Sequence, residues 1–257
     1  MILNRRSFVA IGAAGLTTHV SSWTFARQKS GGAGIQALAF DAFAVFDPRP
    51  VFQSCEEAFP GRGSELADLW RARQFDYQWL RALAGRYADF WQVTQSALDF
   101  ATQSLRLELS SSKRDALMKA YLELKAWPEV SDVLAELRRG GMQLALLSNA
   151  TAEILNASVR NSRLDGAFHH IISTDRIRSF KPDPRAYQLG PDILGLPKET
   201  IVFVASAGWD AAGARWFGYP TFWNNRPNAV SEQLSATPDG AGATLRDLLS
   251  FVKGEHG

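Results

Sequence analysis

Residues 35–46 read IQALAFDAFAVF, in which a short apolar run ends abruptly in the carboxylate of Asp41. The same arrangement recurs where the run at 143–148 (QLALLS) ends in a serine, and where IVFVAS at 201–206 precedes Asp210. Short apolar runs bounded by polar or glycine residues are typical of buried strands. Because ligands of open α/β sheets bind outside the carboxyl ends of the strands, these polar residues are candidates for one shared site.

Strand and helix patterns alternate along most of the chain. The hydrophobic patterns predict strands at 35–40, 143–148, 170–173 and 201–205, helices at 130–139, 152–160, 184–194 and 244–253, and a loop at 224–242. Such alternation favours a parallel sheet with helices on both faces. The predicted fold class is therefore α/β, with a doubly wound parallel sheet.

The segment from 51 to 126 breaks this alternation, because it contains almost only helical patterns, at 64–83, 90–105 and 113–124. We predict an all-helical cap domain over 51–126, inserted into an α/β core formed by 35–50 and 127–257. A cap after the first strand would close over the carboxyl edge of the sheet and exclude water. The alternative is a helical subdomain without a catalytic role, in which the many aromatic residues only pack.

Composition limits the classes of function. Apolar residues make up 46% of the 257 residues, enough for one substantial core. The formal net charge is +2 with no long basic run, so nothing indicates a nucleic-acid partner. Cys55 is the only cysteine, which excludes an intramolecular disulfide and a cysteine-rich metal site. The four histidines lack metal-ligand spacing, and we expect no metal and no other cofactor.

The N-terminus, MILNRRSFVAIGAAGLTTHVSSWTFA, has the layout of a secretory signal, with a basic pair, a modest apolar stretch and a small-residue cleavage site. Arg5 and Arg6 resemble the pair of a twin-arginine export signal. We predict a signal peptide and linker over residues 1–34, cleavage after Ala26 and a periplasmic location. The apolar stretch is too short and polar for a membrane anchor. The alternative is a plain extension, or a start codon placed too early, on a cytoplasmic protein.

Four polar residues suggest covalent catalysis by a carboxylate, in the order aspartate, serine, lysine and aspartate. Asp41 is the candidate nucleophile, and Lys181 in SFKPDPRAY is placed to keep it ionised. A phosphatase is disfavoured, because Phe43 stands where such an enzyme needs a second carboxylate to protonate its leaving group. A halide, which leaves without a proton, suits this site. Asp210 is the only carboxylate near the fourth strand, so Asp41 and Asp210 alone would offer few ligands to a magnesium ion.

Three further residues offer donors to an anion. Ser148 and Asn149 present hydroxyl and amide groups at a strand end, and Arg71 presents a guanidinium fork from the predicted cap. Each also has an ordinary explanation: Ser-Asn is common turn chemistry, and a helix arginine is commonly a solvated surface residue.

Together these residues resemble the haloacid dehalogenase superfamily, and specifically its L-2-haloacid dehalogenase (type II) branch. The resemblance runs from about residue 36 to the C-terminal region. The segments that carry it are FDAFAVFD (40–47), EEAFPGRG (56–63), LWRARQFDYQWLRAL (69–83), LALLSNA (144–150), FKPDPRAY (180–187) and WDAAGARWFGYPTFWNNR (209–226).

The resemblance implies a reaction. Asp41 attacks the halogen-bearing carbon of an (S)-2-haloacid, displaces halide with inversion and forms an ester. Arg71 and Asn149 receive the halide. Water then attacks the ester carbonyl with help from Asp210, which releases an (R)-2-hydroxy acid.

The resemblance also implies how the substrate is held. Ser148 and Lys181 hold its carboxylate. The remaining substrate-binding positions are Phe43, Phe75, Phe90 and Trp209, which line an apolar pocket, and Tyr187, which lies beside the lysine. No metal or cofactor is implied, and family members are commonly homodimers with contacts from the helical cap.

Two departures from the family pattern bear on the second half-reaction. Val45 lacks the hydroxyl that would bond the nucleophile, and Ala207 lacks the amide that helps position the lysine and the water. An altered hydrolytic step is expected. Two other hypotheses stay open: an enzyme acting on another electrophilic 2-substituted acid, for instance by opening a strained ring amine, and an exported binding protein for small acids with weakened turnover.

Overall fold

The computed structural model describes residues 34–254. The predicted signal peptide and linker lie outside the described residues, apart from Gly34. Among the described helices, none is both long and apolar enough to cross a membrane.

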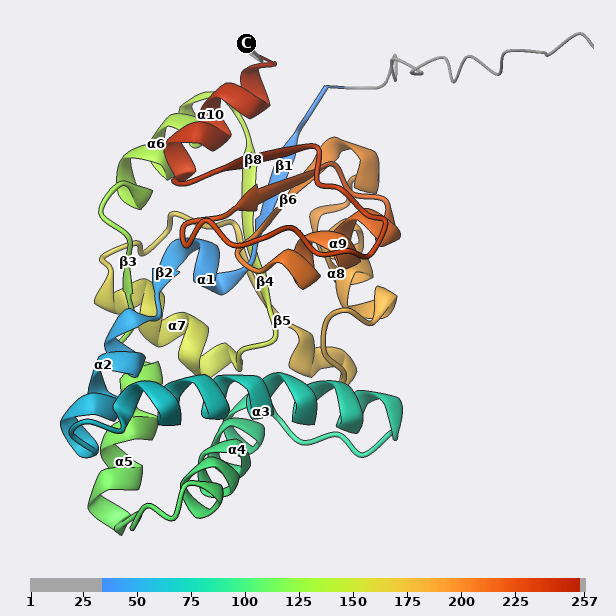
Figure 1. Ribbon diagram of the computed structural model, residues 1–257. Helices are drawn as coiled ribbons and strands as arrows, with labels where there is room; N and C mark the ends of the chain where they lie inside the picture. Colours follow the sequence, from blue (N-terminus) through green and yellow to red (C-terminus); the bar gives the residue numbers. More distant parts are fainter. Residues whose placement is uncertain (1–33, 255–257) are drawn as a thin grey trace, which may run out of the picture. The chain divides into compact units, whose positions relative to one another are not determined.

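A parallel sheet forms the centre of the described part, with six strands in the order β5-β4-β1-β6-β7-β8 (Figure 1). Every pairing in it is parallel, and Phe40 of β1 lies between Leu146 of β4 and Val204 of β6. The strands are β1 (Ala37–Phe40), β4 (Gln143–Ser148), β5 (His170–Ser173), β6 (Ile201–Ala205), β7 (Thr221–Asn224) and β8 (Gly240–Gly242). This order confirms the predicted α/β class.

Side chains alternate across the sheet and create two apolar layers. Leu38 and Phe40 point into one hydrophobic cluster, whereas Ala37 and Ala39 point into another on the opposite face. Helices cover both faces (Figure 1). The first cluster includes residues of α6 (Val130–Arg139), α7 (Ala152–Asn161) and α10 (Leu245–Lys253), and the second those of α8 (Pro184–Leu194) and α9 (Gly208–Phe217).

A helical insertion follows the short helix α1 (Ala42–Val45) and lies at the carboxyl end of the sheet (Figure 1). The strands β2 (Phe46–Asp47) and β3 (Lys125–Ala126) pair antiparallel, so the chain leaves and re-enters the sheet region side by side. The insertion comprises α2 (Arg49–Ala58), α3 (Gly63–Leu83), α4 (Phe90–Ser104) and α5 (Ser111–Lys119). The helix predicted at 113–124 ends early, because the chain tightens into a 3-10 turn at Ala120–Leu122.

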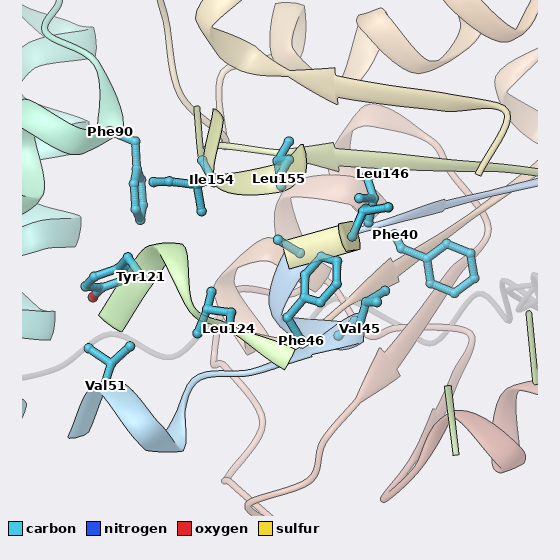
Figure 2. Packing of buried hydrophobic residues seen from close by; sticks show 14 of the residues in the cluster. Phe40, Val45, Phe46, Val51, Phe90, Tyr121, Leu124, Leu146, Ile154 and Leu155 are labelled. Carbon is cyan, nitrogen blue, oxygen red and sulfur yellow. The ribbon is translucent and has the colours of Figure 1, made fainter. Parts of the chain in front are cut away.

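One hydrophobic cluster joins the insertion to the sheet. Figure 2 shows Phe90 of α4 beside Ile154 of α7, and Tyr121 near Leu124, in the same cluster as Phe40. Phe90 is 3% exposed, and burying such a side chain contributes about 1.5–3 kcal/mol. The helices of the insertion are therefore held against the sheet by apolar contact.

The loop predicted at 224–242 is wrong at both ends, because β7 ends at Asn224 and β8 occupies Gly240–Gly242. The sequence of β8 is GAG, which carries no strand pattern. Its glycines are required by packing: a Cβ at Gly240 would lie 2.5 Å from the ring of Phe251, and one at Gly242 would lie 2.3 Å from Cβ of Asp247. Because β8 is set by its packing against α10, its own sequence shows no strand pattern.

Candidate active site

Asp41 stands where β1 meets α1. Its N–H donates to the carbonyl of Val204 (2.9 Å), which extends the ladder with β6 by one residue. Its side chain caps α1 by accepting from the N–H of Phe43 (3.1 Å). The residue is 7% exposed, so the carboxylate is held almost buried at the carboxyl edge of the sheet.

Lys181 lies between two carboxylates. Its ammonium donates to Oδ1 of Asp41 (2.9 Å) and to Oδ2 of Asp210 (2.6 Å), and Lys181 and Asp210 are each 1% exposed. Burial alone would lower the pKa of Lys181, but Asp210 and Asp41 together raise it, so the ammonium stays charged. An ammonium has three donors, and these bonds use two of them.

Asp210 is a weak acid for a carboxyl group. Burial raises its pKa most, Asp41 raises it further, and Lys181 opposes both, which leaves the pKa at about 6. A carboxylate with such a pKa accepts a proton readily near neutral pH, as a general base must.

The two oxygens of Asp41 are bound differently. Oδ1 accepts the ammonium of Lys181, whereas Oδ2 accepts the hydroxyl of Ser206 (2.7 Å) as well as the N–H of Phe43. Ser206 directly follows β6. Val45 is fully buried in the hydrophobic cluster and has no hydroxyl, so among the described side chains the hydroxyl bound to this carboxylate is that of Ser206.

Tyr187 is the one predicted site residue that does not line the cavity around Asp41. It projects from α8 into the hydrophobic cluster that contains Ala37 and Ala39, and it is fully buried. Its hydroxyl donates to Oδ1 of Asp210 (2.7 Å). Tyr187 therefore positions Asp210 and does not contact the space that a substrate would enter.

Asn149 connects three parts of the chain. Its Oδ1 accepts the backbone N–H of Lys181 (2.8 Å) and the hydroxyl of Thr174 (3.3 Å), and its Nδ2 donates to Oε1 of Gln78 on α3 (2.8 Å). At the end of β4, Ser148 accepts from the N–H of Ala150 (3.2 Å). The strand end, the lysine loop and the insertion are thus fixed to one another.

All the other predicted site residues line one small cavity, which we call the catalytic cavity. Its lining consists of Asp41, Phe43, Arg71, Phe75, Gln78, Phe90, Ser148, Asn149, Lys181, Ser206, Ala207, Trp209 and Asp210. Its volume is about 30 Å³, room for about two waters. Gln78 and Ser206 were not predicted as site residues. A signal existed for Gln78, because it lies two helical turns after Arg71 and so shares its face.

Arg71 offers a cation to the cavity. Its guanidinium carbon lies 5.7 Å from the ring centroid of Phe52 and 5.8 Å from that of Phe75. Within residues 34–254 no carboxylate pairs with it. Nor do the described residues contain a cluster of three or more histidine, cysteine or acidic side chains that suits a metal ion. The charge that balances Asp41 and Asp210 is the ammonium of Lys181.

Gln78→Leu is expected to lower kcat/KM about 5- to 30-fold for the halide release that the resemblance implies. The variant leaves the buried amide of Asn149 without its acceptor, which costs about 1–2 kcal/mol if the transition state uses that amide. Gln74→Leu is the matched control, since Gln74 is also buried on α3 but bonds to Thr94, away from the cavity. Equal losses in both variants would contradict a role for Gln78 in the site.

A parallel sheet whose central strand ends in a buried carboxylate paired with a lysine suits covalent catalysis by an aspartate nucleophile. The profile of the haloacid dehalogenase-like hydrolases matches residues 17–218. The chain belongs to this family and, within it, to the L-2-haloacid dehalogenase branch, which confirms the resemblance seen in the sequence.

Its relatives carry consistent names. The chain is 43% identical to the (S)-2-haloacid dehalogenase of Pseudomonas sp. (strain YL) over 220 residues, which cover 85% of this chain and 95% of that protein. It is 41% identical to haloacetate dehalogenase H-2 of Moraxella sp. (strain B), with 80% and 92% covered. The structure of L-2-haloacid dehalogenase from Xanthobacter autotrophicus with chloropropionic acid covalently bound matches it with a TM-score of 0.79 at 34% identity, covering 86% of this chain and all of that one.

Proposed function

We propose that the protein hydrolyses (S)-2-haloacids to (R)-2-hydroxy acids through an ester on Asp41. The observation that carries the proposal is the buried carboxylate of Asp41, bound to Lys181 at the wall of a cavity that Arg71 also lines. The names of the relatives support the substrate class, and the acid bound covalently in the Xanthobacter autotrophicus enzyme supports an ester intermediate.

In the first half-reaction Oδ1 of Asp41 attacks the carbon that bears the halogen. The bond from Oδ1 to this carbon forms as the carbon–halogen bond breaks, and the halide leaves with the electron pair toward Arg71 and Asn149. Ser148 and the third N–H of Lys181 hold the substrate carboxylate. Oδ1 is the attacking oxygen because Oδ2 already accepts two hydrogen bonds.

In the second half-reaction water attacks Cγ of the ester and gives a proton to Asp210. Negative charge develops on Oδ2, where the hydroxyl of Ser206 and the N–H of Phe43 are already placed to stabilise it. The bond from Cγ to Oδ1 then breaks, and the departing alkoxide takes the proton from Asp210. Asp41 keeps the oxygen of the water and is left as a carboxylic acid, which loses its proton to solvent and becomes the carboxylate again. The ester is thus cleared although Val45 and Ala207 lack the polar groups of the family pattern.

Halide release from L- and D-2-chloropropionate tests the proposal, with protein that starts near Arg27. We expect release from the L-isomer alone, with the inverted 2-hydroxy acid as product. Release from neither isomer would favour the alternatives, another electrophilic 2-substituted acid or a binding protein for small acids.

Ester hydrolysis is expected to be half-maximal below pH 6 and to fall about tenfold per pH unit below its midpoint, because the ester removes the negative charge of Asp41 that raises the pKa of Asp210. Asp210 has a pKa of about 6 and accepts the proton of water only when ionised. Tyr187→Phe removes a hydrogen bond that favours the ionised form, so the pKa of Asp210 rises and the half-maximum moves to higher pH. Single-turnover hydrolysis at varied pH measures this, and an unmoved midpoint would exclude Asp210 as the base.

We infer that the insertion over 51–126 acts as a cap, since Arg71, Phe75 and Phe90 reach the catalytic cavity from it. A homodimer is part of the same proposal, and sedimentation of the purified protein tests it.

Export by the twin-arginine route is proposed from Arg5 and Arg6, the apolar stretch that follows them and the small-residue cleavage site. A reporter that requires this route is expected to lose its signal when both become lysine. Unprocessed full-length protein with all its activity in the cytosol would contradict export.

A further inference from the structure

A second hollow lies next to the catalytic cavity and plays no part in the reaction described above. We call it the outer groove; it is lined by Trp79, Ala82, Leu83, Phe180, Pro182, Asp183 and Pro184. Its volume is about 480 Å³ and its lining is mainly apolar. The one charged group, Asp183, already accepts from Ser179 and Arg185, so the groove offers little to a polar ligand.

The outer groove and the catalytic cavity are built from the same two segments. On α3, Phe75 and Gln78 line the cavity, whereas Trp79 and Leu83 line the groove. In the loop at 180–184, Lys181 lines the cavity, whereas the residues on either side of it line the groove. The two spaces are therefore neighbours across a thin wall.

Trp79 forms that wall. Its ring centroid lies 5.8 Å from that of Phe75 and 5.5 Å from that of Trp209, and both of these rings line the cavity. The indole N–H of Trp79 is buried without a hydrogen-bond partner in the described part of the chain. The side chain packs against these rings without a hydrogen bond from its indole, and a buried unpaired donor costs free energy.

The sizes of the two spaces differ. The cavity, at about 30 Å³, has no room for an alkyl tail, whereas the groove, at about 480 Å³, accommodates one. Because the groove is apolar, it suits a tail of methylene groups, each of which gains by leaving water.

We propose that Trp79 sets the upper chain length of the substrate, and that the outer groove is the site for the aliphatic tail of longer 2-substituted carboxylic acids once the indole is displaced. The inference rests on the proposed function only in placing the acid's carboxylate beside Lys181.

Calorimetric binding of two unreactive acids, propionate and octanoate, tests this without turnover. In the wild type we expect their affinities to agree within about threefold. In Trp79→Ala, octanoate is expected to bind at least tenfold more tightly than propionate, since several methylene groups become buried. Trp79→Phe keeps an aromatic ring and the fold, and its preference for octanoate over propionate is expected to lie between those of the wild type and Trp79→Ala. Trp216→Ala is the matched control, because Trp216 is 59% exposed and lines neither space.

Adding Leu83→Trp to Trp79→Ala fills the groove and is expected to cancel the gain for octanoate. An equal change in the affinities for propionate and octanoate in Trp79→Ala would overturn the proposal. So would a shift from dimer to monomer in Leu83→Lys, which would assign the groove to a second copy of the chain. Halide release from L-2-chloropropionate, measured on the same preparations, shows separately whether the proposed function holds.

Discussion

Asp41→Asn is expected to abolish halide release, with kcat/KM reduced on the order of 10⁴-fold or more. The amide is nearly the same size as the carboxylate but is a poor nucleophile, so no ester forms. Its oxygen still accepts a hydrogen bond, and Lys181 keeps Asp210 as its ionic partner. Folding should therefore survive, which thermal unfolding by circular dichroism checks alongside chloride release from L-2-chloropropionate.

Asp210→Asn is the comparison for Asp41→Asn, because it is expected to block the second half-reaction and not the first. It removes the base for water but leaves Oδ1 of Asp41 ready to attack, so one equivalent of halide is released and an acid adduct stays on Asp41. Substantial turnover in Asp41→Asn would place the nucleophile elsewhere. Loss of the halide burst in Asp210→Asn would mean that this carboxylate is already needed for the first half-reaction.

The geometry at the carboxyl edge was predictable because a single rule of parallel sheets brings strand ends together. Asp41, Ser148 and Asp210 each follow a short apolar run, and the register of β1 with β4 and β6 makes them neighbours. Lys181 was a candidate from its loop, but no local pattern shows that its side chain is buried between two carboxylates.

The errors come from contacts between elements that are remote in sequence. Tyr187 stands six residues after Lys181, and only the packing of α8 against α9 decides that its hydroxyl meets Asp210 and not the cavity. Ser206 ends the apolar run at 201–206, directly before Ala207, which lacks the amide of the family pattern. Its bond to Asp41 depends on β6 lying beside β1, which individual residue types do not reveal.

Ser206→Ala is expected to slow ester hydrolysis about 10²- to 10³-fold while alkylation of Asp41 continues. Removing one donor to a developing oxyanion typically costs that much, and Ser206 donates to Oδ2, the oxygen on which the charge develops. Alkylation uses Oδ1, which stays bound to Lys181. A burst of one halide per active site, followed by slow turnover, is the expected result, with the ester visible by mass spectrometry of the intact protein.

Ser173→Ala is the matched control, since Ser173 is also a serine at a strand end, but its hydroxyl donates to the carbonyl of Ala150. It should leave the ratio of the two half-reactions unchanged. Val45→Thr combined with Ser206→Ala is expected to restore part of the hydrolytic rate, because a hydroxyl is returned to the same carboxylate from α1. An equal fall of burst and hydrolysis in Ser206→Ala would show that the serine orients Asp41 for both steps, and the assignment of Oδ2 as the oxyanion position would then be wrong.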